Sequence, residues 1–69
     1  MGWSSGTELM GSIIDLARKH IKSDKDRKAF FVGCIDAFED ADWDCQDECI
    51  GDDAMFDEAL KQLHPDWEL

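Results

Sequence analysis

The chain has 69 residues, which is enough for one small domain but too few for a core together with a deep substrate cavity. Its formal net charge is −10, so direct contact with nucleic-acid phosphates or with an anionic membrane surface is disfavoured. No apolar run approaches the roughly 18 residues of a transmembrane helix. We therefore expect a single domain over residues 1–69 that is not an enzyme and uses no cofactor.

The charges are distributed unevenly along the chain. Residues 1–35 hold six basic and four acidic side chains, whereas residues 36–69 hold one basic and thirteen acidic side chains. Eleven of these acids lie within residues 36–58, where there is no base. A segment of this kind favours the basic surface of another protein as its partner.

Three cysteines are present, and the first residues have neither the basic start nor the apolar stretch of a signal peptide. An odd number of cysteines without an export signal is typical of reduced thiols. We therefore expect a cytoplasmic protein.

The first helix is predicted to begin after Ser5, in a capping box with Glu8, and to end near Lys22. At about 100° per residue its apolar side chains share one broad face. They are Leu9, Met10, Ile13, Ile14, Leu16, Ala17 and Ile21. His20 falls within this face, which predicts a histidine at the edge of the core.

A second helix is predicted from residues 23–26, a short turn that includes its N-cap, to Glu39 or Ala41. The short connection favours an antiparallel helical hairpin. Residues 42–50 are expected to form a loop and a short third helix, which Gly51 ends.

A last helix is predicted to begin after Asp52 or Asp53 and to end at His64, because the residue before a proline resists the α conformation. His64 is expected to interact with the carbonyls of this helix. The predicted fold class is thus all-α, a compact bundle of three to four short helices. Its expected core is Ile13, Ala17, Phe31, Ile35, Phe38, Phe56, Leu60 and Leu63.

Two patterns suggest metal ligands. Asp40, Asp42 and Asp44 have the spacing of an EF-hand loop, but Cys45 stands where that loop requires Gly, and Gly51 stands where it requires a bidentate Glu. Cys45 and Cys49 share a helix face and have only distant histidines, His20 and His64, to complete a site. We predict that the thiols are buried or half-buried and that there is no metal site. We also predict no catalytic residue, because no nucleophile–base motif is present.

Trp43 lies in the middle of the acidic run, and Trp67 lies near the end of the chain. Each is either a core anchor or an interface aromatic surrounded by charge.

Three segments together resemble a family of small, functionally uncharacterised acidic proteins of tailed phages, prophages and some bacteria. They are Gly-Trp-Ser-Ser-Gly at residues 2–6, Asp-Trp-Asp-Cys-Gln-Asp-Glu at residues 42–48 and Leu-His-Pro-Asp-Trp at residues 63–67. The resemblance implies a compact helical fold and brings no catalytic residues. A phage origin favours an accessory protein that binds host or phage machinery.

Our leading hypothesis is a protein-binding module that docks its acidic second half on a basic site of a host or phage protein. If that site normally holds DNA or RNA, the carboxylates take the place of phosphates. The expected binding surface is Asp40, Asp42, Trp43, Asp44, Asp47 and Glu48. One alternative is a divalent-metal-responsive module that uses Asp40, Asp42, Asp44 and Glu48. A second is a structural or dimerisation domain, and the sequence does not fix the oligomeric state.

Overall fold

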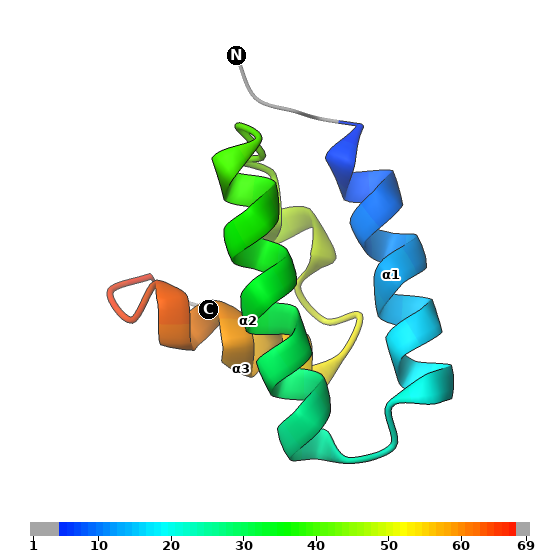
Figure 1. Ribbon diagram of the computed structural model, residues 1–69. Helices are drawn as coiled ribbons and strands as arrows, with labels where there is room; N and C mark the ends of the chain where they lie inside the picture. The colour runs from blue at the N-terminus through cyan, green and yellow to red at the C-terminus, as the bar shows by residue number, and fades with distance from the viewer. Residues whose placement is uncertain (1–4, 68–69) are drawn as a thin grey trace.

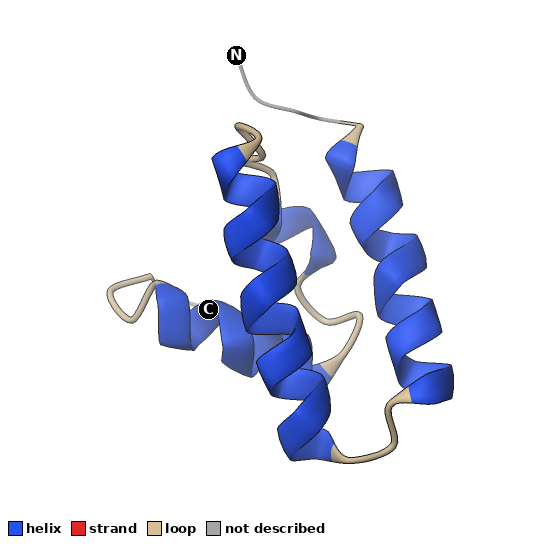
Figure 2. Cartoon of the chain, in the orientation of Figure 1, coloured by secondary structure: helices blue, strands red, loops and turns tan. Residues whose placement is uncertain are grey.

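This computed structural model describes residues 5–67, which form three α-helices, one short 3₁₀ helix and the loops between them. In chain order they are α1 (Gly6–His20), α2 (Asp24–Asp40), η1 (Gln46–Cys49) and α3 (Ala54–Leu63) (Figure 1). Over this range Figure 2 shows helices and loops without a strand. The predicted all-α bundle is therefore confirmed. None of the described helices is both long and apolar enough to cross a membrane.

α1 differs from the prediction at both ends. Ser5 has helical backbone angles and its side chain accepts no capping hydrogen bond, so the predicted capping box with Glu8 is not formed. At the other end Ile21 is extended, with φ −111° and ψ 96°, which ends the helix at His20, two residues before Lys22. The basic side chains of its last turn still lie where they favour the helix dipole.

α2 begins and ends as predicted. The Ser23 side chain accepts a hydrogen bond from the backbone N–H of Asp26, which caps the helix, and α2 ends at Asp40. Only residues 21–23 connect it to α1, and the two helices run antiparallel in Figure 1. The predicted helical hairpin is therefore present.

Local hydrogen bonds and backbone angles explain where α3 begins and ends. Asp53 is the N-cap, and its Oδ1 accepts hydrogen bonds from the N–H groups of Met55 (2.7 Å) and Phe56 (3.4 Å). Gly51, with φ 96°, provides the left-handed turn that separates η1 from α3. α3 ends at Leu63, and His64 before Pro65 is not helical.

The core lies between a layer formed by α1 and α2 and a second layer formed by η1 and α3, which lie behind them in Figure 1. Its buried members are Met10, Ile14, Ala17, Phe31, Ile35, Trp43, Cys49, Phe56, Ala59 and Leu60. Five of the eight predicted core residues are among them, whereas Ile13, Phe38 and Leu63 are only partly buried. Leu9, Leu16 and His20 are exposed, because η1 and α2 cover only part of the apolar face of α1.

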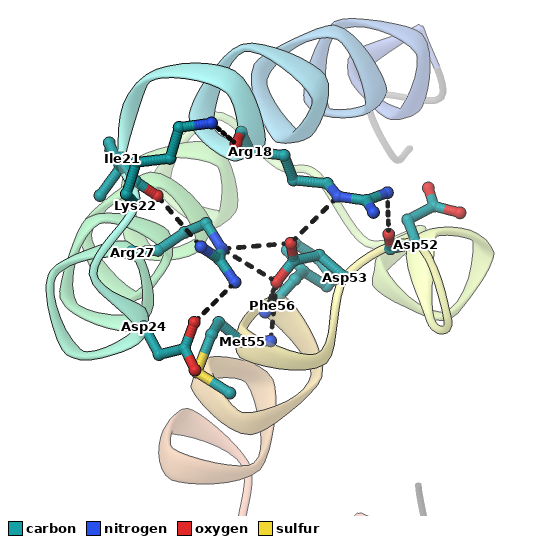
Figure 3. A network of polar contacts seen from close by, with 9 residues as sticks. All are labelled: Arg18, Ile21, Lys22, Asp24, Arg27, Asp52, Asp53, Met55 and Phe56. Carbon is teal, nitrogen blue, oxygen red and sulfur yellow. Dashed lines mark hydrogen bonds and ion pairs between the residues drawn. The ribbon is translucent and has the colours of Figure 1, made fainter.

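A network of charged side chains joins the ends of three helices (Figure 3). The buried carboxylate of Asp53 pairs with Arg27 Nε at 3.2 Å and with Arg18 Nε at 3.6 Å. Arg27 also pairs with Asp24 at 3.0 Å and donates a hydrogen bond to the carbonyl of Ile21. Two cations and two backbone N–H groups thus compensate the desolvation of one carboxylate, which fixes the start of α3 against the α1–α2 connection.

Candidate binding surface

Five acidic side chains follow one another from the end of α2 through the connecting loop into η1. We call Asp40, Asp42, Asp44, Asp47 and Glu48 the acidic surface, and all five are exposed, as predicted. Trp43 lies between them in the sequence but is only 2% exposed. It is a core residue, so its assignment to the binding surface is wrong: the indole supports the acidic surface from below.

The backbone folds tightly where the acidic surface begins. The N–H groups of Ala41 and Trp43 both donate to the carbonyl of Phe38 at 3.0 Å, and that of Asp42 donates to Glu39 at 3.0 Å. Asp42 has φ 67°, a left-handed conformation that aspartate and asparagine tolerate better than most residues. The loop therefore reverses direction within a single turn after α2.

Trp43 fixes this loop to the rest of the molecule. Its ring packs edge-on against Phe38, with ring centroids 5.4 Å apart and an interplanar angle of 79°. Its Nε1 donates a hydrogen bond of 3.2 Å to Oγ1 of Thr7, in the first turn of α1. One side chain thus links the acidic loop to both helices of the hairpin.

Gln46 and Glu39 provide a second anchor. The buried Gln46 Nε2 donates to the carbonyl of Trp43 at 3.2 Å and to Oε2 of Glu39 at 2.7 Å. The same Glu39 oxygen lies 2.6 Å from Nε2 of His64, whose ring stacks on Trp67 at 3.8 Å. The His64 side chain therefore interacts with α2, whereas the backbone N–H of His64 donates to a carbonyl of its own helix, that of Leu60, at 2.9 Å.

Trp67 remains at the surface, 40% exposed. Through His64 and Glu39 it is connected to the last turn of α2, where the acidic surface begins. Two contacts therefore link Trp67 to Glu39, the residue that precedes Asp40 of the acidic surface.

No cation neutralises the acidic surface from within the described residues. The ion pairs of residues 5–67 involve Asp24, Asp53 and Glu39, and none involves a member of the acidic surface. Nearby carboxylates also affect the pKa values of the thiols in this region. Burial, followed by the carboxylates of Asp52, Glu48 and Asp47, raises the pKa of Cys49 to about 11. Burial and the neighbouring Glu48 and Asp44 also raise the pKa of Cys45.

The side chains considered as metal ligands are not brought together. Within residues 5–67 no three His, Cys, Asp or Glu side chains lie close enough to hold a metal ion. His64 pairs with Glu39 instead of with the cysteines, and His20 is exposed on α1. All three cysteines are free thiols, one buried and two half-buried.

Comparison of the chain with protein-family models, with curated proteins and with solved structures found no match.

Proposed function

We propose that the chain is a small protein-binding module that docks its acidic surface on a basic site of another protein. The observation that carries the proposal is the set of five exposed carboxylates without an ion-pair partner, held on a loop that Trp43 and Gln46 fix to the core. The resemblance to phage proteins suggests that the partner is a protein of the phage or of its host.

The clustering of carboxylates in the acidic surface destabilises the folded chain. Carboxylates close together in sequence and without cations repel one another, which lowers the free energy of unfolding. Solubility needs fewer acids and a more even distribution. Complementarity to a basic surface accounts for the excess, because opposite charge accelerates association and orients the two proteins.

A site that normally binds DNA or RNA is the kind of basic surface that we propose. Such sites present several Lys and Arg side chains at phosphate positions, and exposed carboxylates take the place of phosphates as acceptors. The fixed loop also reduces the conformational entropy lost on binding.

Binding accounts for the described residues better than a metal-responsive module or a thiol-based enzyme does. The candidate metal ligands do not converge, so nothing favours a metal-responsive module. The pKa values of all three cysteines are raised, which disfavours the reactive thiolate form.

The test is a capture experiment with three immobilised proteins and a cell lysate. The first is the natural chain. The second carries Asp42→Asn, Asp44→Asn and Asp47→Asn, which preserve shape and suit the left-handed angle of Asp42. The matched control carries Asp15→Asn, Asp26→Asn and Asp36→Asn, which remove the same charge from exposed positions outside the acidic surface.

We expect a basic protein that the natural chain and the control retain, that the acidic-surface variant loses, and that added duplex DNA displaces. Far-UV circular dichroism should show that all three proteins are equally helical. Equal retention by the acidic-surface variant and the control would refute the proposal, since only net charge would then matter.

A further inference from the structure

The exposed apolar side chains of the hairpin gather on one face. Leu9, Ile13 and Leu16 recur at spacings of four and three residues, so they form a stripe along α1 beside the buried stripe of Met10 and Ile14. Leu9 is 47% exposed and Leu16 is 55% exposed. Two exposed leucines two turns apart, with the partly exposed Ile13 between them, form an apolar patch of the kind that another surface usually covers.

α2 contributes a second stripe. Phe30, 41% exposed, lies with the exposed Ala37 and Ala41 on one side of the helix. Val32 lies about 160° around α2 from Phe30 and lines a hollow with Gln62 of α3, so Phe30 faces away from α3 and towards α1.

Both stripes reach the same side of the molecule. In Figure 1 α1 and α2 run antiparallel, with η1 and α3 behind them. Each exposed stripe lies roughly 100° around its helix from the buried residues of that helix, in the same rotational sense, so in antiparallel helices the two stripes turn towards the space between α1 and α2. We call Leu9, Ile13, Leu16, Phe30, Ala37 and Ala41 the apolar face. Five of these six residues are exposed, and Ile13 is partly buried.

We propose that the apolar face is the interface of a symmetric dimer, in which a second copy of this chain packs face to face with α1 antiparallel to α1 and α2 antiparallel to α2. The proposal does not rest on the proposed function, since the apolar face contains no member of the acidic surface. Asp40, Asp42 and Asp44 nevertheless also belong to the acidic end of the hairpin, which lies against the basic end of the second copy.

The charges at the two ends of the hairpin select this partner and this arrangement. Residues 18–28, at the connection, hold six bases and two acids, whereas residues 36–44, at the opposite end, hold five acids and no base. On α1 the exposed Glu8 and Lys19 flank the apolar face at opposite ends. A twofold axis across the helices places the acidic end of one copy against the basic end of the other. An axis parallel to the helices would place like charges together.

The dimensions also suit a dimer. α2 has 17 residues, so it is about 25 Å long, and two adjacent helices are about 20 Å wide. A face of this size has an area of about 500 Å², so two copies bury roughly 1,000 Å² in total, which is the lower limit of a specific interface, and we expect a weak dimer. Because only three residues connect the helices, Phe30 lies level with Ile13 near the middle of the face, so the two copies of Phe30 meet near the axis.

Sedimentation equilibrium of the purified chain tests the dimer. We expect a mass approaching twice 7.9 kDa as concentration rises towards about 1 mM. Phe30→Glu and Leu16→Glu should each raise the dissociation constant at least about tenfold, because every dimer carries the substitution twice. Ala29→Glu is the matched control, since it adds the same charge at an exposed position next to Phe30 but outside the apolar face.

Two results would overturn the proposal: a natural chain that is monomeric over the whole range, or a control that dissociates as readily as Phe30→Glu. If Phe30→Glu loses helical circular dichroism, Leu16→Glu decides. Mixing Glu8→Lys protein with Lys19→Glu protein at low salt tests the arrangement. Association of the two variants with each other should be roughly fivefold tighter than self-association of either, and the absence of a preference overturns the antiparallel pairing.

Discussion

Replacing Trp43 should remove the support of the acidic surface. The side chain is 2% exposed, so Trp43→Ala removes a buried aromatic group and leaves a cavity, which costs about 3–5 kcal/mol. A chain of 69 residues has a free energy of unfolding of about 3–10 kcal/mol in total. The variant should therefore be largely unfolded or strongly destabilised.

Two further substitutions show how much of this loss of stability comes from the indole hydrogen bond and how much any tryptophan would cost. Thr7→Val removes the acceptor of the indole N–H, which lies 3.2 Å away, and should cost about 1–3 kcal/mol because the donor stays in the core without a partner. Trp67→Ala is the control: this ring is 40% exposed, and its loss should cost less than about 1 kcal/mol. Urea unfolding followed by far-UV circular dichroism gives all three values. If Trp43→Ala is no more destabilising than Trp67→Ala, then Trp43 is not the anchor of the loop.

Three other predictions concern charge, thiol titration and metals. Asp53→Asn should lower the free energy of unfolding by about 2–4 kcal/mol in urea, because it removes the charge that pairs with Arg27, whereas Arg18→Ala, at an exposed side chain, should cost less than about 1 kcal/mol. The pKa of Cys49 is raised from 9.0 to about 11, so the folded state holds this proton more tightly, and the associated stability should be lost as pH rises through that interval. Cys49→Ala should reduce this loss in alkaline unfolding titrations, and the raised pKa values of Cys34 and Cys45 should account for part of what remains. Micromolar Ca²⁺ or Zn²⁺ should leave the melting temperature unchanged, and a saturable shift would favour the metal-responsive alternative instead.

The helix boundaries that were predicted well depend on local signals. Ser23 and Asp53 cap α2 and α3 through N–H groups two or three residues away, so the sequence around each is sufficient. Ser5 fits the same pattern and does not cap α1. The exposure of Leu9 and Leu16 was not predictable either, because periodicity identifies an apolar face but not how much of it neighbouring elements cover.

The candidate site also has features that the sequence predicts and features that it does not. The exposure of the five carboxylates follows from their density, since so many charges cannot be buried without partners. The position of Trp43 does not, because it depends on Thr7, 36 residues away. The contact between Glu39 and His64 spans 25 residues and is equally invisible in a local pattern.

The most direct test of the account is the association rate constant between the chain and the basic protein captured with it, measured by stopped-flow fluorescence at increasing salt. Steering by the acidic surface predicts a rate that falls steeply with salt for the natural chain and for the Asp15, Asp26 and Asp36 control. The Asp42, Asp44 and Asp47 variant should start slower at low salt and depend on salt only weakly. The same rate and salt dependence in this variant as in the natural chain would contradict the central claim.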